Sequence, residues 1–220
     1  MVRLLLLREK KAGHINQVEG LAAIAAGLVP CEIARLDVRP KWWAHVAVRN
    51  AFLRHVSLTD KAAVRRAARR VYGIDIAALA KPDVVIGSGR PATALGIWLK
   101  AWFGAKHLFS GHASGPLTAT IDLQLVNSPR VTGPANVALS PVPGKIDADD
   151  YPPPRPLRAA DDLHGASLSL ILGGDSHSHK FSSAEWAHLE PFVREMRARF
   201  GVVWRVTNSR RSPPELAPLF

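Results

Sequence analysis

The chain has 220 residues, of which 47% are hydrophobic and 21% are charged, and it carries a formal net charge of +11 at pH 7. This composition is that of a globular protein and excludes an intrinsically disordered chain, while the single cysteine excludes an internal disulfide. The excess of positive charge favours anionic partners, namely nucleotide phosphates, nucleic acid or an anionic membrane surface.

The first segment predicts a strand, a loop and a helix. Val2–Leu7 is a continuous apolar run, which indicates a strand buried on both faces; it is too short for a membrane span and lacks the cleavage site of a signal peptide. The polar residues 9–17 predict a loop, the Ala- and Leu-rich Val18–Leu28 a helix, and Cys31–Leu36 the next strand. We therefore expect a cytoplasmic protein, and leave open a peripheral position at the inner membrane.

A basic and aromatic region follows. Residues 39–58 include Trp42 and Trp43 and predict an irregular or helical excursion, and Lys61–Tyr72 predicts an amphipathic helix with four arginines on its polar side. This surface suits contact with an anionic membrane. Nucleic-acid binding is the weaker interpretation, because a basic helix face is more commonly just solvated.

A second strand–loop–helix unit lies in the middle of the chain. Asp83–Ile86 predicts a strand, Gly87–Arg90 a tight glycine loop and Pro91–Phe103 a helix with proline in its first turn. Lys106–Phe109 and Leu123–Val126 predict two further short strands. This alternation predicts an α/β fold of Rossmann-like type, with a parallel sheet covered by helices on both faces.

Beyond residue 146 the composition changes. Asp147–Asp162 is charged and rich in proline, which predicts a semi-rigid linker. Ser167–Leu172 and Val202–Thr207 predict strands on either side of a helix, Ser182–Phe200, which Ser182 or Ser183 would cap. The predicted organisation is a Rossmann-like domain (1–146), a linker (147–164) and the start of a second, incomplete Rossmann-like domain (165–220).

Candidate binding residues lie where predicted strands end, because open parallel sheets bind ligands at the carboxyl ends of their strands. Three loops qualify: Gly13–Gln17, Gly87–Arg90 and Gly173–Lys180, the last beside Ser209-Arg210-Arg211. Glycines permit close backbone approach, arginines bind phosphate, and His14 could act as a base. For each loop a plain surface turn is the alternative. Asp175 is the one further potential ligand near His177 and His179 in this loop, so we expect no metal site.

Four segments in this order resemble the mitochondrial fission ELM family: GHINQVEGLA, PDVVIGSGRPATALGIWLK, LILGGDSHSHKFS and TNSRRSPPE. The resemblance runs along most of the chain. It implies a GT-B fold, in which two Rossmann-like domains face each other across a cleft, and a glycosyltransferase-like function. The donor implied is a nucleotide sugar, and no cofactor is expected.

The resemblance also implies roles for particular residues. His14 would be a catalytic base. Acceptor-side residues would be Gly13, Gln17, Gly89 and Arg90. Residues facing the donor phosphates would be Gly173, Gly174, Ser176, Ser209, Arg210 and Arg211.

The chain departs from the family pattern in two places. It ends at Phe220, before a family segment that carries an Asp-Ser and a downstream Glu, and Asn127–Arg130 replaces a His-Asp pair. We therefore expect a truncated or natural short form with impaired transfer activity. About 55 residues bury too little surface for an independent core. We expect them to dock on the first domain, to self-associate through the second sheet or to remain marginal in stability. The alternative function is a non-catalytic membrane-surface or protein-interaction protein that retains the fold.

Overall fold

A computed structural model of the protein describes residues 1–127, 135–139, 143–146, 150, 153, 156–175, 180–209 and 212. The chain divides into two compact units, which we call unit 1 (Met1–Tyr151) and unit 2 (Pro152–Phe220). The division falls inside the segment interpreted as a linker. No described helix is both long enough and apolar enough to cross a membrane.

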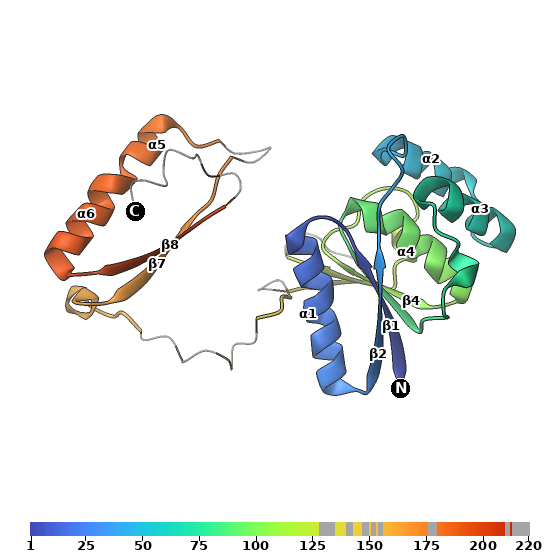
Figure 1. Ribbon diagram of the computed structural model, residues 1–220, viewed down its shortest axis with the longest axis horizontal. Helices are drawn as coiled ribbons and strands as arrows, with labels where there is room; N and C mark the ends of the chain where they lie inside the picture. The colour runs from blue at the N-terminus through green and yellow to red at the C-terminus, as the bar shows by residue number, and fades with distance from the viewer. Residues whose placement is uncertain are drawn as a thin grey trace. The chain divides into compact units, whose positions relative to one another are not determined.

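Unit 1 is an α/β unit built on a six-stranded sheet with the order β2-β1-β3-β4-β5-β6 (Figure 1). Every strand pair is parallel, which confirms the predicted sheet. The strands are β1 (Val2–Arg8), β2 (Cys31–Asp37), β3 (Val84–Ser88), β4 (Lys106–Ser110), β5 (Leu123–Val126) and β6 (Asn136–Ala138). The helices are α1 (Ala12–Leu28), α2 (Val46–His55), α3 (Lys61–Tyr72) and α4 (Arg90–Phe103), with short 3-10 turns at Ile76–Ala78 and Thr118–Thr120.

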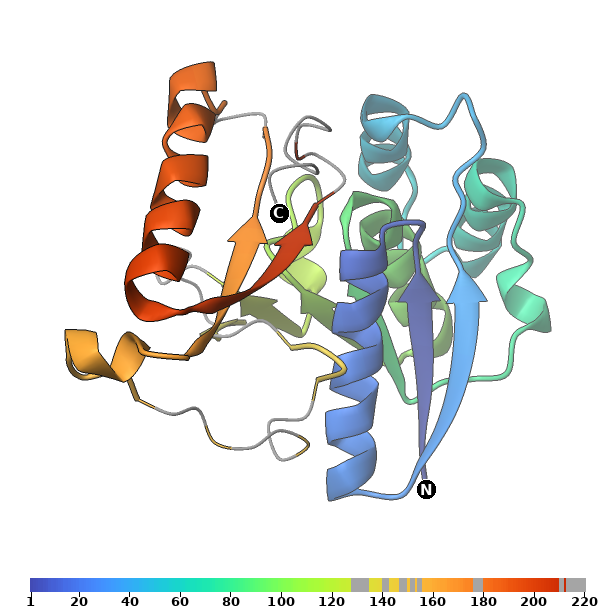
Figure 2. The same ribbon diagram turned by 60° about the vertical axis from the view of Figure 1, so that its left-hand side comes forward.

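The four leucines of β1 explain why both faces of the sheet are covered. Successive side chains of a strand point to opposite faces. Leu4 and Leu6 therefore pack against α1, whereas Leu5 and Leu7 belong to the larger core beneath α3 and α4. Figures 1 and 2 show α1 on one face of this sheet and α2, α3 and α4 on the other. Burying each leucine stabilises the fold by about 1.5–3 kcal/mol.

Helix α3 holds the beginning of α4 in place. Asp60 caps the first turn of α3 by accepting a hydrogen bond from the N–H of Ala63, and Gly73 ends the helix in the left-handed region. Tyr72 donates a hydrogen bond to the carbonyl of Pro91 (2.7 Å) and packs edge-on against Trp98. The basic residues of α3 face outward, so its amphipathic character is confirmed.

Several predicted boundaries in unit 1 are wrong. Helix α1 begins at Ala12, six residues before the predicted start, so Gly13–Gln17 is helix and not loop. Gly87 and Ser88 complete β3, and only Gly89 separates this strand from α4. The short strand β6 was not predicted, because three residues give too little periodicity to recognise.

Unit 2 is one strand–helix–strand unit. Its strands β7 (Ser167–Leu172) and β8 (Val203–Asn208) pair in parallel. The predicted single helix is wrong, since α5 (Ser183–Ala187) and α6 (Leu189–Phe200) are separate. Pro191 explains the break, because it has no N–H to donate to the carbonyl of Ala187. The predicted cap is confirmed, with Ser182 accepting a hydrogen bond from the N–H of Glu185.

The described part of unit 2 is thinly packed. Alternate residues of β7 are shielded, and Trp204 of β8 donates its indole N–H to the carbonyl of Val193 on α6. Leu172 and Val202 are the buried hydrophobic side chains among its described residues, whereas Ile171 is 80% exposed. One face of this small sheet is therefore covered and the other is open.

The fully buried His107 of β4 predicts acid sensitivity of unit 1. Its ring lies against Gly96, and neither ring nitrogen has a hydrogen-bond partner within the described residues. Burial, assisted by Lys100 and opposed by Asp122, lowers the pKa of His107 from 6.5 to about 4. Between pH 6.5 and pH 4, His107 is therefore protonated in the unfolded chain and neutral in the folded one. The free energy of unfolding consequently falls as the pH falls from 6.5 towards 4. The loss reaches up to about 3 kcal/mol.

Chemical denaturation at a series of pH values measures this effect. The difference in unfolding free energy between pH 7 and pH 4.5 should shrink in His107→Leu, which has no group to protonate. His55→Leu, at an exposed site on α2, is the matched control and should keep the original pH dependence. An unchanged pH dependence in His107→Leu would contradict the prediction.

Candidate functional site

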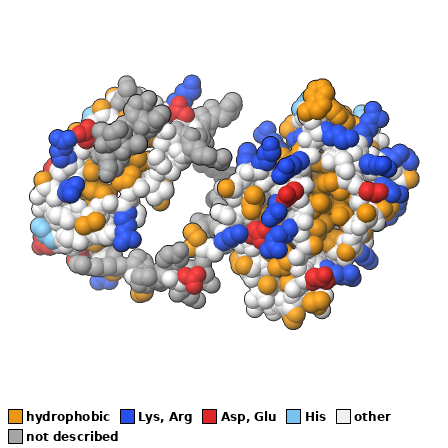
Figure 3. Space-filling view, viewed as in Figure 1, with side chains coloured by type: hydrophobic (Ala, Val, Ile, Leu, Met, Phe, Trp, Pro, Cys, Tyr) orange, Lys and Arg blue, Asp and Glu red, His pale blue; other side chains and the backbone are white. Residues whose placement is uncertain are grey.

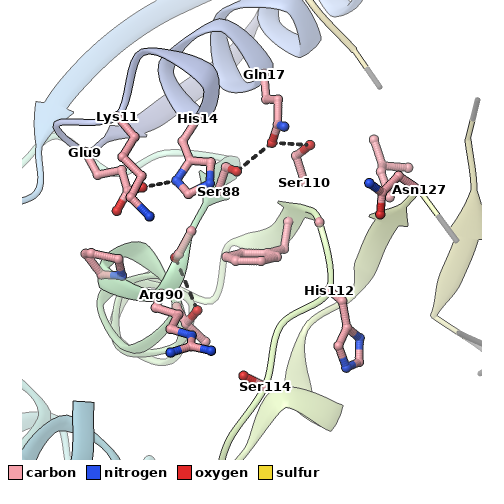
Figure 4. A pocket seen from close by; sticks show the side chains of 16 residues that line it. Glu9, Lys11, His14, Gln17, Ser88, Arg90, Ser110, His112, Ser114 and Asn127 are labelled. Atoms are coloured by element: carbon pink, nitrogen blue, oxygen red, sulfur yellow. Dashed lines mark hydrogen bonds and ion pairs between the residues drawn. The ribbon is translucent and has the colours of Figure 1, made fainter. Parts of the chain in front are cut away.

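A pocket of about 520 Å³ lies in unit 1 where the carboxyl ends of β1, β3, β4 and β5 meet the first turns of α1 and α4 (Figure 4). This is the place where open parallel sheets bind ligands. Its described lining residues are Glu9, Lys11, His14, Gln17, Ser88, Gly89, Arg90, Pro91, Thr93, Phe109, Ser110, Gly111, His112, Ser114, Leu125 and Asn127.

Glu9 and His14 form a pair at one wall of the pocket, in which Glu9 is buried and His14 is partly exposed. Glu9 directly follows β1 and is only 6% exposed, and its carboxylate contacts Nδ1 of His14 in the first turn of α1. Because an ionised carboxylate only accepts hydrogen bonds, Nδ1 carries the proton in this pair and Nε2 keeps its lone pair. Burial lowers the pKa of His14 below its usual value of 6.5, so the imidazole is neutral at pH 7.

Gly89 allows this pair to lie against the start of α4. Its φ of +81° and ψ of 157° belong to a region that only glycine adopts readily. A Cβ atom at this position would lie 2.3 Å from Nδ1 of His14 and 2.6 Å from Oε1 of Glu9. Both the backbone conformation and the close approach therefore require glycine here.

Gln17 connects three elements at the floor of the pocket. Its Oε1 accepts hydrogen bonds from the hydroxyls of Ser88 (2.7 Å) and Ser110 (3.2 Å), which are both 1% exposed. Figure 4 shows Gln17 reaching from α1 to these two strand ends. With Oε1 so engaged, the amide NH₂ of Gln17 remains available to donate hydrogen bonds to a ligand.

The pocket carries uncompensated positive charge. Lys11 and Arg90 are exposed, and neither has an ion-pair partner among the residues that the structure describes. Glu9 is the one acidic side chain in the described lining, and its carboxylate contacts His14. Such a pocket attracts an anion or the partial negative charge of hydroxyl and carbonyl oxygens.

Four acceptor-side residues and one base were predicted, and the structure brings four of these five residues together. His14, Gln17, Gly89 and Arg90 line the pocket, whereas Gly13 is exposed on α1 and does not. Sequence reasoning missed Glu9, Ser88 and Ser110. A carboxylate at the end of a buried strand, five residues before His14, was the available signal for Glu9.

The residues expected to face donor phosphates lie in unit 2, and only part of them is described. Gly173 and Ser209 follow the paired residues Leu172 and Asn208 at the ends of β7 and β8, so the two strand ends lie side by side. Ser212 Oγ lies 2.7 Å from the carbonyl of Gly173 and 2.9 Å from the N–H of Ser209. Gly174 follows Gly173, while Ser176, Arg210 and Arg211 lie outside the described residues.

No group of three potential metal-ligating side chains is found in the described ranges. His177 and His179 lie outside them.

Fold and site define a Rossmann-like α/β protein with a polar, positively charged pocket at the carboxyl edge of its first sheet. The model of the family described as mitochondrial fission ELM1 matches residues 12–220, and the chain belongs to this family. The expected family resemblance is thus confirmed. A search of curated proteins finds no match.

Among solved structures, the chain is similar to the crystal structure of MurG from Acinetobacter baumannii, with 11% identity and a TM-score of 0.46. The similarity covers 100% of this chain and 69% of that chain. At this level of similarity no residue role is transferred.

Replacing Gly89 tests how tightly the site is packed. Gly89→Ala should lower the unfolding free energy by at least about 1–3 kcal/mol, because alanine is disfavoured in this backbone conformation and its Cβ collides with the Glu9–His14 pair. Denaturant titration measures the change. Gly27→Ala, on the exposed side of α1 with open space around it, is the control and should stabilise slightly. Equal effects at both sites would contradict this account.

Proposed function

We propose that the protein is glycosyltransferase-like and that the pocket of unit 1 holds an acceptor whose hydroxyl is activated by His14. The observation that carries this proposal is the Glu9–His14 pair at the pocket wall, where Nε2 of a neutral imidazole has no protein partner among the described residues. A carboxylate that fixes the ring and tautomer of a histidine is the usual arrangement for a general base.

The chemistry follows from these positions. The acceptor oxygen attacks the anomeric carbon of a nucleotide sugar and forms the new glycosidic bond. The bond from that carbon to the diphosphate oxygen breaks, and the leaving diphosphate keeps the electron pair. The hydroxyl proton moves to Nε2 of His14, and the imidazolium so formed is stabilised by the carboxylate of Glu9.

Within this proposal, unit 2 receives the donor. Backbone N–H groups after β7, at Gly173 and Gly174, and the side chains of Arg210 and Arg211 would stabilise the departing diphosphate. The steps of this proposal use no metal and no other cofactor.

Two variants test the role of the pair. His14→Asn should lower kcat/KM by about 10²–10⁴-fold, since it removes the base. Glu9→Gln should cost less, and should move the acidic limb of the pH profile to lower pH, because it removes the charge that favours the imidazolium. In the unaltered chain, activity should be lost on the acidic side at a pH below that of an ordinary histidine, because burial lowers the pKa of His14 from 6.5.

Release of nucleoside diphosphate from a panel of uridine, guanosine and cytidine diphosphate sugars, with sugar alcohols and sugar phosphates as acceptors, is the measurement. His45→Asn, at an exposed histidine outside the pocket, is the matched control and should keep full activity. Turnover that survives in His14→Asn would refute the assignment of the base. Absence of turnover with every donor would refute the proposed function.

A second candidate, contact with an anionic membrane surface, is favoured by the position of Trp42. This side chain is 94% exposed. The N–H of Lys41, the residue before Trp42, donates to the carbonyl of Val71 in the last turn of α3, and the same turn carries Arg69 and Arg70. Figure 3 shows Lys and Arg side chains spread over the visible face of unit 1. An exposed tryptophan among cations is typical of a membrane-interface contact.

Co-sedimentation with vesicles tests this candidate. The protein should bind phosphatidylcholine vesicles that contain phosphatidylglycerol and not those of phosphatidylcholine alone, and Trp42→Ala should weaken the binding. Leu28→Ala, which removes a 78% exposed side chain on α1, is the control. Equal sedimentation with both kinds of vesicle, or none with either, would contradict contact with an anionic membrane surface.

A further inference from the structure

The geometry points to a phosphoryl group on the acceptor: we infer that the pocket of unit 1 binds a molecule that carries a phosphate ester or diphosphate next to its reacting hydroxyl. This inference rests on the proposed function for the hydroxyl, but the binding of the phosphoryl group can be measured without any transfer reaction. It adds a second anion-binding place to the protein, distinct from the donor-phosphate residues expected in unit 2.

The two cations of the pocket differ from many other basic side chains of unit 1. Elsewhere in unit 1 many basic side chains have acidic partners; examples are Arg8 with Asp37, Arg35 with Glu19, Arg65 with Asp75 and Lys100 with Asp122. Lys11 and Arg90, in contrast, line the same pocket without an acidic partner in the described part of the chain. With the carboxylate of Glu9 counted and His14 neutral, the two cations leave the described lining with a net charge of about +1, which favours an anionic ligand.

The arrangement of the pocket's two helices adds to this charge. Neither α1 nor α4 has a side-chain cap or an acidic residue in its first turn, although α3 in the same unit is capped by Asp60. The partial positive charge at both helix starts is thus left for a ligand.

The size of the cavity suits a ligand that is larger than a phosphate group. A cavity of about 520 Å³ is far larger than a phosphate needs, and it falls in the range of pockets for small molecules. Since His14, Lys11 and Arg90 line one cavity, a ligand can place a hydroxyl at the imidazole while its phosphoryl group meets the two cations. Arg90 offers the planar fork that suits phosphate oxygens, and Lys11 a point charge.

Calorimetric titration of the full chain with inorganic pyrophosphate tests the inference. The double variant Lys11→Gln/Arg90→Gln should bind pyrophosphate at least about tenfold more weakly than the unaltered chain. Lys10→Gln, one residue outside the pocket lining, is the matched control and should bind within about twofold of it. Binding that persists unchanged in the double variant would place the anion elsewhere, such as unit 2, and would overturn the inference.

Two further titrations sharpen the result. Malonate tests whether any dianion suffices; affinity equal to that of pyrophosphate would contradict a phosphoryl-specific pocket. Hexose 1-phosphate and farnesyl diphosphate then distinguish a soluble from a lipid-linked source, and tighter binding of either than of pyrophosphate, lost in the double variant, supports the inference.

His14→Asn separates this inference from the proposed function, because it should keep pyrophosphate binding and lose transfer. If pyrophosphate binds the pocket but no nucleotide sugar is turned over, only the proposed function fails. If transfer occurs equally well to acceptors with and without a phosphoryl group, only this inference fails.

Discussion

The structure of unit 1 depends on burying β1 from both sides. Four consecutive leucines in a strand point alternately to the two faces of the sheet, so a helix layer on one face cannot bury them all. Helix α1 covers Leu4 and Leu6, while α4 and its neighbours cover Leu5 and Leu7. Parallel strands with helical crossovers are the arrangement that provides two such layers. That arrangement brings the strand ends and the starts of α1 and α4 to one edge of the sheet, and the candidate site is built there.

The site places polar groups where burial makes them costly. A carboxylate as buried as that of Glu9 needs a partner, and His14 supplies it from the next helix. The contact is possible only because position 89 has no Cβ. Ser88 and Ser110 likewise reach hydrogen bonds with Gln17 instead of being left unpaired. Each buried polar group thus fixes a neighbouring element, which keeps the pocket open and preorganised.

The two units differ in how much they bury. Unit 1 has a core on each side of its sheet, whereas the described part of unit 2 has one sheet face covered and few buried side chains. The match to the mitochondrial fission ELM1 family extends over both units. Our proposal assigns acceptor binding to unit 1 and donor binding to unit 2.

The sequence by itself determined the parallel α/β class, the strands Leu123–Val126 and Ser167–Leu172, a cap at Ser182 or Ser183 and the family, because apolar runs, capping residues and motifs are local signals. It located His14, Gln17, Gly89 and Arg90 as separate candidates. It did not reveal that Glu9 contacts His14, or that Ser88 and Ser110 meet at Gln17. Those contacts join residues on different strands and helices, so only the register of the sheet and the packing of α1 across it decided them.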